Sequence, residues 1–241
     1  MGARLSAVVF DMDGVLIDSE PLHYSVLRDL LAGEDCALSS TEYEQFLGTT
    51  TQATLETLID RHSLQRPLAD YLADYNAGVL HLLEQPHAPQ PGVVTLIERL
   101  RQLQMPLALA SSSARAWIDA TLRSIGLSDA FDAIASGNEV SRSKPDPEIY
   151  LLAAERLGIN PECCLAIDDA PNGIASARAA GMAVLAVRTP YTVHLTLDGA
   201  QRVVNSLADL DLAALDFLWL EDSSADTRRQ VPDLTPPHDG Q

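Results

Sequence analysis

Four short apolar runs in this 241-residue chain each end beside side chains that could do chemistry. These side chains are carboxylates, hydroxyls and one ammonium: Asp11 and Asp13 after the first run, Ser111 and Ser112 after the second, Lys144 near the third, and Asp168 and Asp169 after the fourth. Each has an ordinary explanation alone, because Asp is a common turn former and Ser a common helix N-cap. Lys144, however, is the only lysine among 16 basic residues. The repeated pattern therefore favours a shared function.

The chemistry that these residue types favour is phosphoryl transfer. Several carboxylates in one place repel each other unless a hard cation lies among them, and Mg²⁺ prefers such oxygen ligands. A carboxylate can also attack phosphorus to form an aspartyl phosphate, which splits one difficult step into two easier ones. A lysine and a hydroxyl would then offset the charge on the transferring group.

The apolar runs are typical of strands in a parallel sheet. Residues 5–10 predict a first, buried strand, and a linker with three prolines follows much later, at residues 86–92. Beyond it we expect helices at 93–103, 114–125, 147–157 and 172–180, alternating with strands at 105–110, 131–136, 163–167 and 183–187, and a short edge strand at 203–204. This alternation predicts an α/β fold with helices on both faces of a parallel sheet. Ligands of such sheets bind beyond the carboxyl ends of the strands, where the polar residues lie.

Only helical patterns occur between the first strand and the proline-rich linker. Pro21 stands where the first turn of a helix tolerates it, and leucines recur at helical spacing after it. We therefore expect a helical insertion at residues 18–87 within a discontinuous α/β core of residues 1–17 and 88–220. Residues 221–241 are polar and unpatterned, which favours a disordered tail.

Four motifs, in this order, resemble the signatures of the haloacid dehalogenase superfamily: Asp11-Met-Asp13-Gly14-Val15, then Ser111, then Lys144 in Ser-Lys-Pro-Asp-Pro, then Asp168-Asp169 with Gly173 downstream. The resemblance implies a Rossmann-like core with an inserted helical cap. It also implies Asp11 as the nucleophile and Asp13 as the general acid and base. Ser111 and Lys144 would bind the phosphoryl group. Mg²⁺ would be held by Asp11, the backbone carbonyl of Asp13 and Asp169, with Asp168 close enough to assist.

The insertion resembles the cap of the subgroup that contains β-phosphoglucomutase and many sugar-phosphate phosphatases. Its segment Ser-Glu-Pro-Leu-His places Glu20 and His23 near the expected substrate, although a half-buried helix residue is an equal explanation of His23. Mutases of this type carry an arginine about where Thr51 falls, and a lysine in the cap. Threonine cannot form the bidentate cationic contact that a second phosphate would need.

The resemblance therefore favours a Mg²⁺-dependent phosphatase of a small phosphorylated metabolite, such as a sugar or polyol phosphate, that binds it through Ser111, Ser112, Lys144, His23, Glu20 and Thr51. A β-phosphoglucomutase-like mutase is the alternative. A catalytically silent binding module is less favoured, because Asp11, Asp13 and Lys144 are all present.

Composition narrows the partners and the location. The formal net charge of −18 argues against nucleic acid, which binds proteins through clustered Lys and Arg. No apolar run approaches the roughly 20 residues that span a bilayer, so we expect no membrane partner. The odd number of cysteines, 3, predicts no disulfide framework. We expect a soluble cytoplasmic protein, monomeric or weakly dimeric.

Overall fold

The computed structural model of the chain describes residues 5–210, and these contain one six-stranded parallel sheet. Its strand order is β3-β2-β1-β4-β5-β6, and every neighbouring pair is parallel. The strands are β1 (Ala7–Phe10), β2 (Leu107–Ser111), β3 (Ala133–Ser136), β4 (Cys164–Asp168), β5 (Ala183–Val187) and β6 (Arg202–Val204). The predicted α/β fold class is confirmed, and β1 lies at the centre of the sheet.

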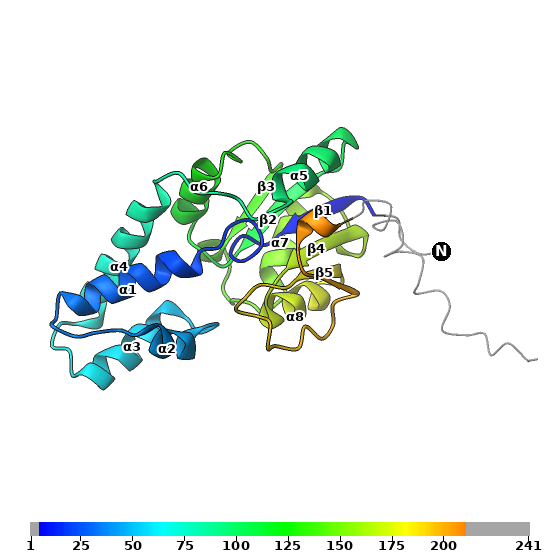
Figure 1. Cartoon of the computed structure of the whole chain (residues 1–241). Coiled ribbons are helices and arrows are strands. Elements are labelled where there is room, and N and C mark those ends of the chain that lie inside the picture. The colour runs from blue at the N-terminus through cyan, green and yellow to red at the C-terminus, as the bar shows by residue number, and fades with distance from the viewer. Residues whose placement is uncertain (1–4, 211–241) are drawn as a thin grey trace, which may run out of the picture.

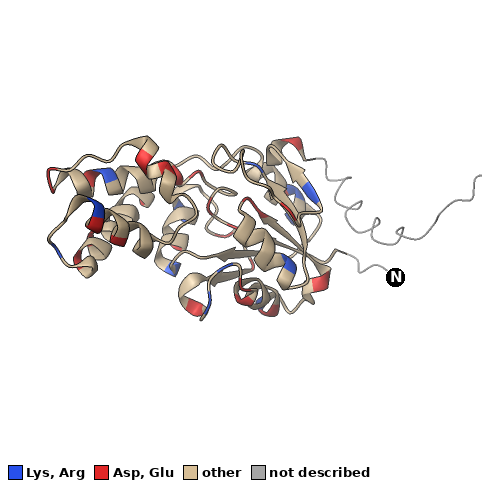
Figure 2. Ribbon diagram, turned by 90° about the horizontal axis from the view of Figure 1, so that it is seen from below, with Lys and Arg blue, Asp and Glu red and all other residues tan. Residues whose placement is uncertain are grey.

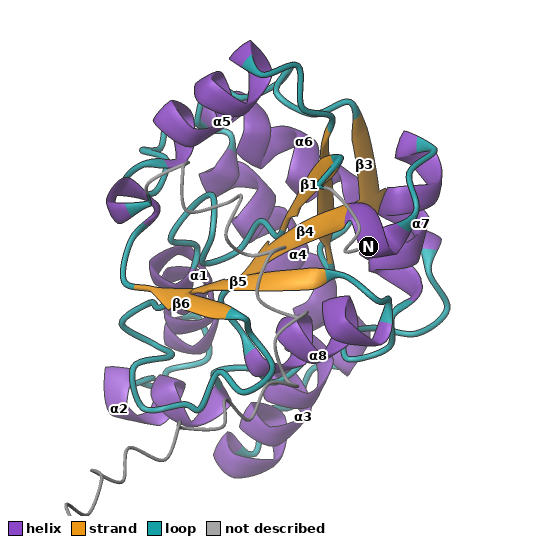
Figure 3. Cartoon of the chain, turned by 90° about the vertical axis from the view of Figure 1, so that its right-hand side faces the viewer, coloured by secondary structure: helices purple, strands orange, loops and turns teal. Residues whose placement is uncertain are grey.

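Helices cover both faces of the sheet (Figure 3). They are α5 (Val93–Gln102), α6 (Arg115–Ser124), α7 (Glu148–Leu157) and α8 (Pro171–Ala179). Val8 and Phe10 of β1 pack in one apolar cluster with α5 and α6, whereas Ala7 and Val9 pack in a second cluster with α7 and α8. Strands buried on both faces are apolar throughout, which is why the sequence shows runs instead of alternation.

The face that meets α7 and α8 is built largely from small residues. Besides β1, its strands contribute Ala108, Ala110, Ala133, Ala135, Cys164, Ala166, Val184 and Ala186. Small side chains let the two helices approach the sheet closely. This close approach places residues of α7 and α8 within reach of the strand ends.

The chain between β1 and α5 forms helices only, and it extends to one side of the sheet (Figure 1). These helices are α1 (Glu20–Ala32), α2 (Ser40–Tyr43), α3 (Thr51–His62) and α4 (Leu68–Leu83), with a 3₁₀ turn at Glu44–Phe46. Helix α1 packs on α4 so closely that a side chain added at Gly78 would lie 2.9 Å from Val26. We call residues 18–87 the helical insertion, and its division from the core at these residues stays a prediction.

Several predicted boundaries need correction. Strands β2 and β4 end at Ser111 and Asp168, one residue later than expected, because these two residues still pair with Ser136 of β3 and Ala186 of β5. The sequence analysis missed α2, a single turn in which the Ser39 hydroxyl accepts the backbone N–H of Glu42. The predicted tail at 221–241 lies outside the described residues. Within residues 5–210, no helix is both long and apolar enough to cross a membrane.

The interior of the helical insertion can be tested by a matched pair of leucine substitutions. Leu58 in α3 is fully buried, whereas Leu151 in α7 is 41% exposed. We expect Leu58→Ala to lower the free energy of unfolding by about 2–5 kcal/mol, because it leaves a cavity. Leu151→Ala, also within a helix, should cost less than about 1 kcal/mol. Urea unfolding followed by circular dichroism measures both, and equal costs would contradict a packed interior in the insertion.

Candidate active site

The carboxyl end of the central strand lies between the ends of its two neighbours, and all three carry polar residues. Asp11 directly follows β1, while Ser111 and Asp168 are the last residues of β2 and β4. The backbone N–H of Asp11 donates to the carbonyl of Ile167 at 2.8 Å, so the sheet ladder continues up to the acidic residues. Acidic residues gather in the loops between this sheet edge and the helical insertion (Figure 2).

Lys144 joins two of these strand ends. Its Nζ donates to Asp11 Oδ1 and to Asp168 Oδ2, both at 2.8 Å, and its side chain is only 10% exposed. Burial alone would lower the pKa of Lys144, but the charges of Asp11 and Asp168 outweigh burial and hold that pKa well above its usual value. The ammonium is therefore a fixed positive charge among the carboxylates.

The loop that carries Lys144 is held from both sides. The carboxylate of Glu148, at the start of α7, accepts the backbone N–H groups of Ser141 and Arg142 at 3.0 Å. On the far side of the lysine, the Ser176 hydroxyl of α8 donates to the carbonyl of Asp146 at 2.6 Å. These bonds explain why the single lysine lies at the strand ends and does not point into solvent.

Asp168 is fully buried, and its carboxylate has a donor on each oxygen. Oδ2 accepts the Tyr150 hydroxyl at 2.5 Å as well as Lys144, and Oδ1 accepts the backbone N–H of Ala170 at 3.0 Å. A side chain at Gly173 would lie 1.9 Å from this carboxylate, so only glycine fits there. Sequence reasoning missed Tyr150, which reads as one more apolar residue on the inner face of α7.

The neighbouring acid, Asp169, has a different environment. It keeps 9% of its surface exposed, and the Thr189 hydroxyl donates to its Oδ2 at a long 3.4 Å. The turn after β1 makes room for it, because a side chain at Gly14 would lie 2.3 Å from Oδ2 and this glycine has a φ of +79°. Burial, together with the charges of Asp168 and Asp11, raises the pKa of Asp169 to about 8.

The three buried acids form a set that fits a hard cation. One oxygen each of Asp11, Asp168 and Asp169 lies within 4.8 Å of the others. Burial raises the pKa of Asp11 to about 7, although Lys144 opposes the shift. All the donor atoms are oxygens, and these buried acids resist ionisation unless positive charge is added. Both properties suit Mg²⁺. The side chain of Asp13, expected to contribute only its backbone carbonyl, is not part of this set.

Asp13 is oriented by two hydroxyls. Ser19 donates to its Oδ1 at 2.6 Å, and Ser113 donates to its Oδ2 at 3.1 Å. All three serines form one triplet at the end of β2, but the sequence analysis gave a role in the site only to Ser111 and Ser112. Ser111 is fully buried and accepts the Ser113 N–H at 3.1 Å, whereas Ser112 is exposed.

The predicted residues of the helical insertion meet around two tyrosines. The Tyr43 hydroxyl donates to the Glu20 carboxylate, and Tyr75 bonds His23 Nδ1 at 2.7 Å and interacts with Thr51. Burial raises the pKa of Glu20 and that of Tyr75, and the charge of Asp13 adds to both shifts. Glu20, His23 and Thr51 thus lie in one group on the side of Asp13.

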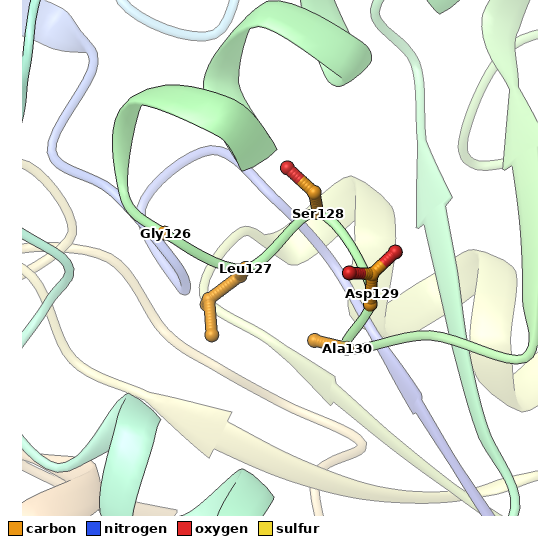
Figure 4. A pocket seen from close by; sticks show the side chains of 5 residues that line it. All are labelled: Gly126, Leu127, Ser128, Asp129 and Ala130. Carbon is orange, nitrogen blue, oxygen red and sulfur yellow. The ribbon is translucent and has the colours of Figure 1, made fainter.

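Trp117 of α6 completes this group from the core. Its ring lies 5.8 Å from that of His23 and 6.1 Å from that of Tyr75, centroid to centroid. His23 is half-buried. A hollow at the opposite edge of the sheet, lined by residues 126–130 ahead of β3, contains none of the predicted site residues (Figure 4).

Comparisons with known proteins identify a family of hydrolases. A family model described as haloacid dehalogenase-like hydrolase matches residues 5–181. The chain is 31% identical over 221 residues to hexitol phosphatase B of Escherichia coli K12, covering 91% of this chain and 96% of that protein.

Two solved structures are similar over nearly their whole length. The crystal structure of CbbY from Rhodobacter sphaeroides in complex with phosphate has a TM-score of 0.77 at 31% identity, covering 88% of this chain and 99% of that one. The structure of β-phosphoglucomutase from Clostridium difficile has a TM-score of 0.77 at 26% identity, covering 91% and 99%.

The acidic set makes a prediction about Mg²⁺ and pH. The raised pKa values of Asp11 and Asp169 mean that the metal-free fold loses stability as pH rises from about 4, where the unfolded acids ionise, through about 7 to 8, where the folded ones do. Mg²⁺ would bind the ionised forms and release protons, so we expect its affinity to rise up to about tenfold per pH unit and per proton between pH 6 and 8. At 100 times the dissociation constant, Mg²⁺ should add about 2.7 kcal/mol of stability.

Thermal unfolding in Mg²⁺ and in EDTA at several pH values measures this effect. Asp169→Asn should remove most of the stabilisation by Mg²⁺. Asp119→Asn is the matched control, because Asp119 is 40% exposed and pairs only with Arg115 among the described salt bridges. A stabilisation that does not vary with pH, or that survives in Asp169→Asn, would contradict the site.

Proposed function

The chain belongs to the haloacid dehalogenase-like hydrolase family, and from that premise we propose that it is a Mg²⁺-dependent phosphatase of a sugar or polyol phosphate. Its relatives, among them hexitol phosphatase B, indicate that it is a phosphoric monoester hydrolase. We propose the substrate class, the metal and the covalent intermediate on the basis of the site.

One observation carries the proposal: the only lysine of the chain contacts Asp11 at 2.8 Å within a cluster of three buried carboxylates. Such a cluster is costly to bury unless positive charge offsets it. A phosphorylated substrate would bring still more negative charge to the same place. An arrangement that concentrates a nucleophilic carboxylate, a fixed ammonium and a cation-binding acid set supports phosphoryl transfer.

In the proposed reaction, an Asp11 carboxylate oxygen attacks phosphorus and the bond to the leaving oxygen breaks. Asp13 gives its proton to that oxygen, since Ser19 and Ser113 hold its carboxyl group in place. Water then attacks the aspartyl phosphate and passes a proton to Asp13. Inorganic phosphate leaves, and Asp11 is restored.

Asp11 and Asp169 would hold Mg²⁺, with the backbone carbonyl of Asp13 as a further oxygen ligand. Bound Mg²⁺ would offset the negative charge that builds up where carboxylates meet a phosphate. Lys144 contributes the second positive charge, and it neutralises phosphoryl oxygens beside Asp11. Ser111, at the end of β2, can donate its hydroxyl proton to the same group.

The group around Glu20, His23 and Thr51 supports an uncharged, hydroxyl-bearing leaving group. It offers a carboxylate, an imidazole and hydroxyls, which match sugar or polyol hydroxyls in hydrogen bonding. The arginines of the helical insertion are already paired with carboxylates: Arg28 with Asp29, Arg61 with Glu42, and Arg66 with Asp74 and Glu34. Their pairing supports a substrate with a single phosphate.

A β-phosphoglucomutase-like activity remains the second candidate because of one contact. The hydrogen bond from Ser19 to Asp13 ties the general acid to the first residues of the helical insertion, so movement of the insertion could gate proton transfer. The likeness to the mutase of Clostridium difficile agrees with this alternative. Thr51 and the paired arginines weigh against it.

The proposed function can be tested by phosphate release from a panel of sugar phosphates, polyol phosphates and nucleotides with Mg²⁺. We expect release from one class of monophosphate, with little from a bisphosphate of the same carbon skeleton. Asp11→Asn should lower turnover by at least about 10³-fold, because no nucleophile remains. Its circular dichroism spectrum should match the wild type, which separates lost chemistry from lost folding.

The panel also includes β-glucose 1-phosphate with a trace of glucose 1,6-bisphosphate. Glucose 6-phosphate formed without free phosphate would establish the mutase alternative. Wild-type turnover in Asp11→Asn would remove Asp11 from the mechanism. No release from any compound would overturn the proposed function.

The role of Asp13 makes a prediction about leaving groups. Asp13→Asn should slow the hydrolysis of an alkyl phosphate by about 10²- to 10⁴-fold, because the alkoxide leaves without a proton. Hydrolysis of 4-nitrophenyl phosphate should be slowed much less, since nitrophenolate needs no proton to leave. Single-turnover rates of phosphorylation measure both, and equal losses would argue that Asp13 is not the general acid.

A further inference from the structure

Tyr150 is a buried tyrosine whose hydroxyl lies within the acidic site. It belongs to α7, is fully buried, and donates to Asp168 Oδ2 at 2.5 Å. The same oxygen accepts Lys144, whose Nζ lies 3.4 Å from the Tyr150 oxygen and 4.9 Å from the centroid of its ring. Nothing in the reaction proposed above uses this residue.

The two adjacent acids are satisfied very differently. Every oxygen of Asp168 has a close protein donor, from Tyr150, Lys144 or the Ala170 N–H, and the carboxylate is fully buried against Gly173. Asp169 has only the long contact with Thr189 among its described hydrogen bonds, and it keeps some exposure. Protein donors thus occupy Asp168, whereas Asp169 keeps its oxygens for another ligand.

We propose that Tyr150 is a positioning residue that fixes the Asp168 carboxylate, and through it the Lys144 ammonium, so that Asp168 serves the lysine and not the metal. This inference rests on the proposed phosphatase, because Lys144 has its role in phosphoryl transfer. It assigns Asp168 to the lysine, where the sequence analysis expected it to assist Asp169 in holding the metal.

The physical need for the hydroxyl follows from the reaction. Lys144 is shared between Asp11 and Asp168. During turnover Asp11 loses its carboxylate charge when one of its oxygens bonds to phosphorus in the aspartyl phosphate. Only Asp168 then remains as a constant anchor for the ammonium. Without the tyrosine hydroxyl, Oδ2 would keep Lys144 as its one close donor, so the carboxylate and the ammonium could shift together. The hydroxyl holds the carboxylate independently of the lysine and satisfies its second buried acceptor position.

The rest of α7 is suited to hold this hydroxyl in place. Ile149 and Ala153 on the same helix are buried against the sheet, so the Tyr150 ring is fixed by packing on a regular element. The small residues of this sheet face bring the helix close enough for the ring to reach Asp168. Burial and the charge of Asp168 raise the pKa of Tyr150 well above its usual value, so the hydroxyl stays a donor.

The test is Tyr150→Phe, which removes the hydroxyl and keeps the ring. We expect kcat to fall about 10- to 100-fold, as for other residues that orient a reacting group, with a smaller rise in KM because Lys144 also holds the bound phosphate. Tyr71→Phe is the matched control. Tyr71 is also buried, and Arg66 lies 4.8 Å from its ring centroid, but it belongs to α4. Tyr71→Phe should leave kcat unchanged.

Metal affinity distinguishes the two tasks of the acids. Thermal unfolding in a Mg²⁺ titration should give Tyr150→Phe an affinity within about twofold of wild type, whereas Asp169→Asn should lose at least about tenfold. An equal loss of Mg²⁺ affinity in both variants would overturn the assignment, because Asp168 would then act as a metal ligand. An unchanged kcat in Tyr150→Phe would overturn the positioning role.

A double-mutant cycle shows whether Tyr150 acts through Asp168. We expect Tyr150→Phe to have almost no further effect on kcat in an Asp168→Asn background, because the group that it positions is already lost. Multiplicative losses would mean that Tyr150 acts by another route.

A binding measurement keeps the inference testable if no substrate is found. In Mg²⁺, inorganic phosphate should stabilise the wild type against heat, and Tyr150→Phe should weaken this binding while Tyr71→Phe does not. If the wild type hydrolyses nothing in the panel, the proposed function fails, whereas unchanged phosphate binding in Tyr150→Phe refutes the role of Tyr150 alone.

Discussion

The contact between Lys144 and two buried carboxylates is the interaction on which the site depends. Parallel strands deliver acidic residues to one edge of the sheet, and helices on both faces exclude most of the water there. Buried like charges repel, and the raised pKa values of Asp11 and Asp169 show how strongly burial opposes ionisation. A single ammonium offsets part of this charge without closing the site. In the proposed phosphatase, the negative charge that is not offset is the electrostatic basis for binding a cation together with a phosphate.

The packing of the core serves this arrangement. Alanines on one sheet face allow α7 and α8 to pack close to the sheet, so Tyr150 and Gly173 lie against Asp168. On the other side of the acid pair, the turn after β1 needs a glycine at residue 14 because Asp169 fills the space where a side chain would lie. Two glycines thus make room for two adjacent acids. A larger residue at either position would collide with a carboxylate, and at residue 14 it would also strain a backbone with a φ of +79°.

Most of the core was predictable from sequence because its signals are local. Strands buried on both faces give uninterrupted apolar runs, and polar residues at their ends follow directly in the chain. The contacts that the sequence did not predict span long distances along the chain: Tyr150 donates to an acid 18 residues away, and Ser113 donates to an acid 100 residues away. A tyrosine on the buried face of a helix was the available signal for the first, because a buried hydroxyl needs a partner. The pairing of His23 with Tyr75, 52 residues apart, left no local pattern at all.

The strand ends and the helical insertion contribute different interactions to the site, and this difference affects which substrate would be selected. At the strand ends, charge dominates and suits any phosphoryl group. In the helical insertion, the arginines are paired with carboxylates, and the Tyr43 hydroxyl donates to Glu20. Buried polar groups reject a ligand that leaves them unpaired more strongly than apolar walls reject one of the wrong size. The insertion can therefore select by the pattern of hydroxyls on the leaving group, while the core treats each phosphate alike. In the proposed phosphatase, substrate selection would then rest on hydrogen bonding in the helical insertion, separate from the charge that drives the chemistry at the strand ends.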